Sequence, residues 1–242
     1  MTLKKQIAHN TLIQLFGKIL STLLGLMTVF VMTRSLGVDK FGWYVTAVGF
    51  LQFVGIFSDF GFIITTANML SEPRFEQKRL LNTLFTWRLI TAAIFQGGAP
   101  LLFLLFPYPV EIKIAVGIIS ISFLAICVSN VFTGYYQQQL KTYINTTGEL
   151  IGRVVLLLGA LMLSKFDAKF LPMMTLISVA STLNAIYLYY KMPPVKISFD
   201  QEISRALFAK IWPTALGVIF NSFYLQGDRV ILPLSTSASD VA

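Results

Sequence analysis

Charged residues are scarce in this 242-residue sequence: they make up 12% of the chain, whereas hydrophobic residues make up 55%. A soluble domain typically has about 25% charged residues. The apolar residues also fall in long blocks, such as 12–31 and 114–131. Because about 20 apolar residues cross the hydrocarbon core of a bilayer as a helix, these blocks predict transmembrane helices. No stretch alternates between apolar and polar residues for long enough to suggest a strand of a transmembrane β-barrel. The predicted fold class is therefore an all-α, polytopic membrane bundle.

Cysteine and histidine are almost absent, with Cys127 and His9 the single examples of each. A lone cysteine inside an apolar segment excludes an intrachain disulfide and a cysteine-based metal site. One histidine argues against zinc. The net charge of +8 can indicate a nucleic-acid partner, but the basic residues are spread among short segments and form no basic face. We expect no metal, no cofactor, no catalytic residue and no nucleic-acid partner.

Seven spans are predicted, over residues 10–33, 42–68, 80–106, 112–136, 145–164, 169–190 and 211–233. Met192-Pro193-Pro194 ends the sixth span, because proline removes a backbone donor. Ser198-Phe-Asp-Gln201 has the pattern of a capping box and predicts a short amphipathic helix before span seven. Its expected membrane-facing residues are Phe199, Ile203, Ala206 and Leu207, and its expected water-facing residues are Asp200, Glu202, Arg205 and Lys210.

The short connections between spans carry an uneven share of the basic residues, which predicts the orientation of the chain. The N-terminal side has ten, namely Lys4, Lys5, Arg74, Lys78, Arg79, Lys141, Lys191, Lys196, Arg205 and Lys210. The opposite side has five, namely Arg34, Lys40, Lys113, Lys165 and Lys169. Because Lys and Arg concentrate in cytoplasmic loops, we predict a cytoplasmic N-terminus, in the cytoplasmic (inner) membrane of the cell.

A shift of the sequence by 200 positions aligns the first span with the seventh, so that Gly17 matches Gly217 and Val31 matches Ile231. This weak repeat suggests that six helices make one unit and that the seventh begins another. The predicted domains are accordingly a six-helix lobe over 1–195, and a linker helix with the seventh span over 196–242.

Three motifs connect the chain to a known family. They are Thr33-Arg-Ser-Leu-Gly-Val-Asp-Lys-Phe-Gly-Trp-Tyr44, Ser58-Asp-Phe-Gly-Phe62 and Gln226-Gly-Asp-Arg-Val-Ile231. Together they resemble the polysaccharide-exporter branch of the multidrug/oligosaccharidyl-lipid/polysaccharide flippase superfamily. The resemblance implies two six-helix bundles around a central cavity and transport of a lipid-linked oligosaccharide by alternating access. Seven spans correspond to the N-terminal half of such a protein, so the implied partners are the lipid-linked saccharide, the bilayer, a coupling proton or sodium ion, and a second half or another copy.

Charges inside spans are the candidate site residues, because each costs about 2.5–3.5 kcal/mol to place at the centre of a bilayer. Lys18, Arg88 and Arg153 each lie about eight residues beyond the cytoplasmic start of their spans, at a depth of about 12 Å. Three cations at one depth predict a basic ring that binds a pyrophosphate or an acidic sugar. The alternative is that these side chains snorkel to the interface or pair privately.

Local patterns distinguish the three cations. Lys18 adjoins the small-residue stripe Gly17, Ser21 and Gly25, which favours close helix packing and places Lys18 toward protein. Arg153 has Glu149 one turn earlier, so a structural ion pair is an equal alternative there. The sharpest expectation is that Lys18 and Arg88 line one polar cavity.

Three further charges complete the candidate substrate-binding set. Asp59 either gates the cavity or takes a proton, or else it caps a helix end that Gly61 helps to terminate. Asp228 and Arg229 are neighbours in span seven and cannot face the same way. One of them is expected to reach the cavity.

The leading functional hypothesis is a flippase for an anionic lipid-linked saccharide. A multidrug or cation antiporter of the same superfamily would need more membrane carboxylates than Asp59, Glu149 and Asp228 supply against four cations. A membrane-embedded transferase would need paired acid and base groups, and the loop carboxylates Glu72, Glu76 and Glu111 are scattered. A non-transporting fragment or partner subunit is the remaining alternative.

Overall fold

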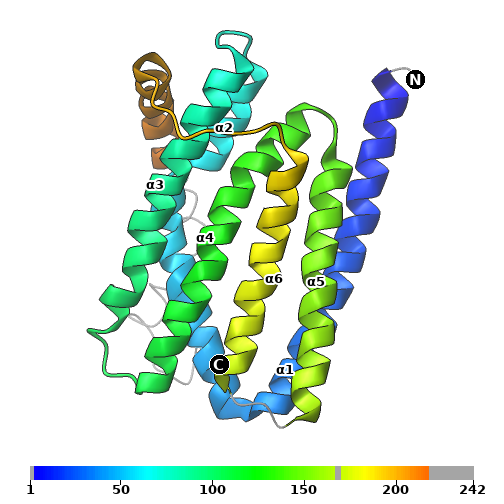
Figure 1. Cartoon of the computed structure of the whole chain (residues 1–242), viewed down its shortest axis with the longest axis vertical. Helices are drawn as coiled ribbons and strands as arrows, with labels where there is room; N and C mark the ends of the chain where they lie inside the picture. The colour runs from blue at the N-terminus through cyan, green and yellow to red at the C-terminus, as the bar shows by residue number, and fades with distance from the viewer. Residues whose placement is uncertain (1–2, 167–169, 218–242) are drawn as a thin grey trace, which may run out of the picture.

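A computed structural model of the chain describes residues 3–166 and 170–217. Within them the secondary structure consists of helices, with no strand, and the helices stand side by side as a bundle (Figure 1). This confirms the predicted all-α membrane bundle. Among the described residues, four helices are long and apolar enough to cross a membrane.

The first helix, α1 (Leu3–Asp59), contains the first predicted span and much of the second. A straight helix of 57 residues would be about 85 Å long, far more than a bilayer is thick. Gly37 breaks it with φ 73° and ψ 171°, a conformation essentially restricted to glycine. The chain reverses there, so α1 consists of a first arm (3–36) and an antiparallel second arm (38–59) (Figure 1).

The second predicted span is not one continuous helix, which corrects the sequence analysis. The helix ends at Asp59, and Phe60 (φ 38°) and Gly61 (φ 79°) adopt left-handed conformations before α2 (Phe62–Ser71) begins. A methyl group on Gly61 would also come within 2.7 Å of the Thr214 side chain. The break therefore occurs where a glycine allows both the backbone turn and a close contact.

The other helices follow the predicted spans three to six closely. They are α3 (Gln77–Phe103), α4 (Val110–Gln138), α5 (Thr142–Lys165) and α6 (Phe170–Lys191). Of these, α3 is not among the helices that qualify as spans by apolar composition, because charged and amide side chains recur along it. The helix α4 packs against α3 and α6, and α5 packs against α6 and α1.

Two apolar clusters fill the bundle, one toward each end. The cluster near the Gly37 end includes Met32, Leu51, Phe103, Ile119 and Phe170. The cluster near the opposite end includes Phe62, Leu84, Phe132, Tyr136 and Leu207.

A layer of buried polar groups separates these two clusters. Arg88 and Ser58 are both 2% exposed within it. The Ser122 hydroxyl donates to the Ser181 hydroxyl at 2.6 Å, and Ser178 donates to the Ile118 carbonyl at 2.6 Å. Since a bilayer core offers no water, these groups are satisfied inside the protein.

The first arm of α1 packs on α5 through the predicted small-residue stripe, which confirms that part of the sequence analysis. A methyl group on Gly17 would overlap the Thr146 side chain, and one on Gly25 would lie 3.2 Å from the Arg153 guanidinium. Small residues thus let the two helices approach closely. At the start of the contact, the Thr142 hydroxyl donates to the Asn10 side chain at 3.0 Å.

After α6 the chain continues as an extended segment over 193–200 and then a helix over 201–217, which lies beside α3 (Figure 1). The Lys196 amide donates to Asn82 and the Ser198 amide donates to Thr86, both at 3.0 Å. The Trp87 indole donates to Ser204 at 2.9 Å. These bonds attach the segment to α3 along its length.

The predicted capping box and membrane face of this segment are wrong in part. Asp200, not Ser198, caps the helix, accepting from the amides of Glu202 (3.1 Å) and Ile203 (3.2 Å). The Ile203 amide and the Arg79 guanidinium lower the pKa of the Asp200 carboxyl. Ile203 and Leu207 are buried in the bundle, because packing on α3 uses the apolar face that was assigned to lipid.

The helix over 201–217 also runs across the predicted start of span seven at residue 211. The remainder of that predicted span lies outside the described residues. The predicted domain boundary at residue 195 falls in the extended segment, and the division into two domains stays a prediction.

We expect Gly17→Ala to lower the stability of the bundle by about 1–3 kcal/mol, because the added methyl overfills the α1–α5 contact. The measurement is thermal unfolding in detergent, followed by dye labelling of Cys127, the sole cysteine, which is buried. Gly49→Ala is the matched control, because nothing lies within 4 Å of its added methyl. Thr146→Ser should restore the stability of Gly17→Ala by removing the overlapped methyl. Equal stability of the two alanine variants would contradict the close contact.

Candidate functional site

Glu149 on α5 is the centre of a polar cluster between α5 and the first arm of α1. The Ser21 hydroxyl donates to Glu149 Oε1 at 2.5 Å. Lys18 Nζ lies 3.9 Å from the same oxygen, and an Arg153 guanidinium nitrogen lies 4.0 Å from it. Two cations therefore share one carboxylate, which leaves the cluster with a net positive charge.

The two cations are open to the outside of the described bundle. The Lys18 side chain is 73% exposed and that of Arg153 is 42% exposed. Both nitrogen–oxygen separations exceed a normal hydrogen-bond distance. Within the described part of the chain, neither cation donates a hydrogen bond, so their N–H groups are available to a further acceptor.

A hollow of about 410 Å³ opens beside this cluster, lined by Thr11, Gln14, Leu15, Lys18, Asn145, Thr146 and Glu149. Lys18 lies about 12 Å along the apolar part of α1, which begins at Asn10. Charged side chains at that depth face water or protein and not lipid tails. The hollow thus lies beside the part of α1 that is apolar enough to span a membrane, and most of its lining side chains are polar.

Arg88 on α3 belongs to a different cluster, inside the polar layer. It is 2% exposed and donates to the Cys127 carbonyl at 3.0 Å and to the Ser58 carbonyl at 2.9 Å. Its guanidinium lies 3.3 Å from Asp59 Oδ1 and 5.2 Å from the centre of the Phe62 ring. Arg88 therefore holds together the end of α1, the start of α2 and the middle of α4.

Asp59 is the last residue of α1, at the break that Gly61 makes possible. The Arg88 guanidinium lies 3.3 Å from its Oδ1, so Asp59 stands at a helix junction beside a buried cation. A role for Asp59 in gating or proton transfer stays a prediction.

The structure brings Lys18 and Arg153 together but places Arg88 elsewhere. Equal depth along three helices did not make a single ring, because Lys18 is on the first arm of α1 beside α5, whereas Arg88 packs against the second arm and α4. Lys18 also extends outward from the small-residue stripe instead of into protein. Asp228 and Arg229 lie outside the described residues. Whether any of the six residues binds substrate stays a prediction.

The sequence analysis treated Glu149 as a membrane carboxylate and as the i, i+4 partner of Arg153, and that pair is present at 4.0 Å. The additional contacts of Glu149 with Ser21 and Lys18 join residues far apart in the sequence. The partners of Arg88 include two backbone carbonyls, which leave no residue-type signal. A carboxylate inside a predicted span was the available clue to Glu149.

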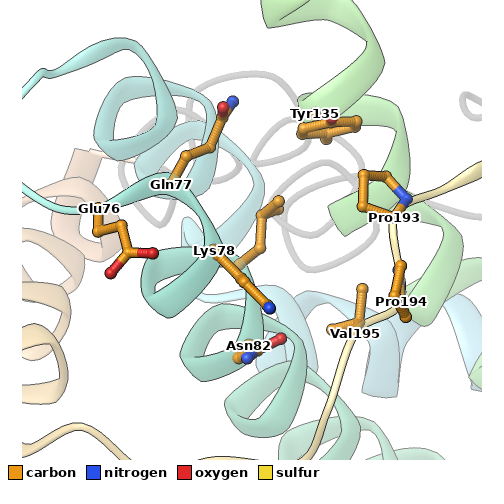
Figure 2. A pocket seen from close by; sticks show the side chains of 9 residues that line it. Glu76, Gln77, Lys78, Asn82, Tyr135, Pro193, Pro194 and Val195 are labelled. Carbon is orange, nitrogen blue, oxygen red and sulfur yellow. The ribbon is translucent and has the colours of Figure 1, made fainter.

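A second hollow lies at the end of the bundle where α3 begins and α4 ends. Figure 2 shows Lys78 and Asn82 on one side of it, Pro194 and Val195 on the other, and Tyr135 at its rim. The extended segment 193–200 closes one side of this hollow. Its position at the end of the bundle separates it from the cluster around Glu149.

A family model described as polysaccharide biosynthesis protein matches residues 7–242, nearly the whole chain. The chain belongs to this family. No curated protein and no solved structure matches it. In this polysaccharide biosynthesis protein, the fold and the family together support the role of a polysaccharide-related membrane transporter.

We expect Arg88→Gln to destabilise the protein by about 3–5 kcal/mol, because it leaves Asp59 without its cation and two carbonyls without a donor. In the double variant with Asp59→Asn, the loss should be smaller than the sum of the single losses. Thermal unfolding monitored at Cys127 measures all three. Arg79→Gln breaks an exposed ion pair with Asp200 and should change stability little. Additive losses at Arg88 and Asp59 would show that the pair is not coupled.

Proposed function

We propose that this protein is a flippase that moves an anionic, lipid-linked saccharide across the cytoplasmic membrane by alternating access. The observation that carries the proposal is the Lys18–Glu149–Arg153 cluster, which has an excess positive charge and opens to a polar hollow within the membrane region. Membership of the polysaccharide biosynthesis protein family supports a saccharide as the cargo.

The residues of the hollow, together with Arg153 next to Glu149, fit the two chemical parts of such a cargo. Lysine and arginine form charge-assisted hydrogen bonds with phosphate oxygens, which suits the pyrophosphate that joins sugar to lipid. The side-chain amides of Gln14 and Asn145 and the hydroxyl of Thr146 can bond sugar hydroxyls, because each donates and accepts. A cationic drug would meet the excess positive charge, which disfavours the antiporter alternative.

In the proposed mechanism the protein uses no catalytic residue and no cofactor. A proton or a sodium ion is the coupling ion. Its partners are the lipid-linked saccharide and the bilayer, with a second lobe or another copy facing the exposed cluster. Charges in the membrane region need such a polar neighbour.

We expect Lys18→Ala and Arg153→Gln each to slow transport of a polyprenyl-pyrophosphate-linked sugar about tenfold or more, since each removes a charge-assisted hydrogen bond to cargo. The measurement is accessibility of a fluorescent cargo in proteoliposomes that contain the full chain. Lys18→Arg should keep more activity than Lys18→Ala. Lys165→Ala, at the end of α5, is the control and should transport normally. Normal transport by folded Lys18→Ala would refute the proposed site.

We also expect a cytoplasmic N-terminus, because the basic residues concentrate at one end of the bundle. Figure 1 places the start of α1 and the connections α2–α3, α4–α5 and the one after α6 at that end. Reporter fusions after Lys78 and Lys196 should be cytoplasmic, and one after Lys113 external. An external signal from the reporter after Lys196 would contradict the predicted topology.

A further inference from the structure

The cations of the Glu149 cluster are bonded differently from those of two other ion pairs of the described residues. Arg79 and Lys210 both hydrogen-bond their partner carboxylates, Asp200 and Glu72. Lys18 and Arg153 stay at 3.9 Å and 4.0 Å from Glu149, beyond hydrogen-bond distance. The one other pair at such a separation, Lys40–Glu111 at 4.0 Å, lies near the end of the bundle, where water can complete its bonding.

The geometry of the carboxylate explains why it does not satisfy both cations. Ser21, Lys18 and Arg153 all lie nearest the same oxygen of Glu149, Oε1. Of the three, Ser21 donates a hydrogen bond to it. One carboxylate also balances only one of the two positive charges. A phosphate or pyrophosphate carries more charge and more oxygens than a carboxylate. It can therefore accept from both cations at hydrogen-bond distance.

We propose that Glu149 is a resident counter-ion that competes with the phosphate of the cargo for Lys18 and Arg153, and so sets the affinity of the site for anions. This inference rests on the proposed function. With no cargo present, Glu149 holds the two cations near one another. When cargo enters, its phosphate replaces Glu149 as their acceptor, and on release Glu149 takes them back.

Such competition serves a transporter because its site must bind cargo well enough to load and weakly enough to unload. Two unopposed cations in a low-dielectric region would hold a pyrophosphate too tightly. Glu149 is 32% exposed and attached by one side-chain hydrogen bond from Ser21, so it can move aside without breaking the α1–α5 packing at Gly17.

A purely structural role for Glu149, in which it fastens α1 to α5, makes a different prediction. Neutralising a structural carboxylate lowers stability and leaves anion affinity unchanged or weaker. Neutralising a competing carboxylate strengthens anion binding. Affinity therefore separates the two roles.

The test measures binding of farnesyl pyrophosphate to the full chain in nanodiscs of uncharged phosphatidylcholine, with farnesol as the probe that lacks phosphate. We expect Glu149→Gln to bind farnesyl pyrophosphate about tenfold more tightly than wild type, equivalent to about 1.4 kcal/mol, with no change for farnesol. The gain should disappear in Glu149→Gln combined with both Lys18→Ala and Arg153→Gln. Glu111→Gln is the matched control, because it neutralises a carboxylate paired with a lysine outside the hollow. It should leave affinity unchanged.

Transport gives the second measurement, because tighter binding slows release. Glu149→Gln should load cargo at lower concentration than wild type but turn over more slowly. If Glu149→Gln does not fold, Glu149→Asp is the second variant. Its shorter side chain holds the carboxylate farther from the two cations, so it should raise the affinity for farnesyl pyrophosphate by a smaller factor. Folding is checked by the burial of Cys127.

The outcomes separate this inference from the proposed function. If Lys18→Ala weakens binding and folded Glu149→Gln binds equally or less tightly than wild type, the counter-ion role is wrong and the proposed site stands. If neither wild type nor Glu149→Gln binds farnesyl pyrophosphate more tightly than farnesol, both proposals fail. A gain in Glu149→Gln that persists without both Lys18 and Arg153 would overturn the counter-ion role at this site.

Discussion

A bilayer core supplies no hydrogen-bonding partner, so the backbone polar groups there must find one within the protein. The break between α1 and α2 depends on this constraint. At the break Phe60 and Gly61 adopt left-handed conformations, and the buried Ser58 and the partly exposed Asp59 carboxylate lie at the end of α1. Arg88 bonds the Ser58 carbonyl and pairs with the carboxylate, while its third contact reaches the Cys127 carbonyl of α4. One arginine thus lets the chain turn inside the bundle, and the two apolar clusters pack on either side of it.

The same constraint explains the difference between the cluster around Glu149 and the cluster around Arg88. Arg88 is buried and has protein partners for its charge, so it needs no further acceptor. Lys18 and Arg153 are exposed, share a single carboxylate and donate no hydrogen bond within the described residues. The enclosed cluster is suited to holding helices together, and the open one is suited to binding an anion. Their difference lies in exposure and bonding, because both contain the same kinds of side chain.

Much of the fold follows from local patterns. Apolar blocks of about 20 residues gave α3 to α6 nearly at their observed ends, and the Gly17–Ser21–Gly25 spacing indicated the α1–α5 contact. The amphipathic helix was predicted near its observed position, but its apolar face was assigned to lipid. Ile203 and Leu207 instead pack against the bundle, since apolar residues bury equally well against protein or lipid. A sequence pattern alone does not distinguish these two environments.

Local patterns suffice to show that the chain is a helical membrane protein, which connections share an end of the bundle, and which helices contain charges at depth, because these properties depend on hydrophobicity and on helix rise. Which of the charges meet depends on how the helices pack. Lys18 and Arg88 are at similar predicted depths, yet the reversal at Gly37 and the break at Gly61 place them against different helices. Glu149 joins Lys18 across more than a hundred residues because glycines on α1 allow that arm to approach α5 closely, a contact that depends on packing between distant segments.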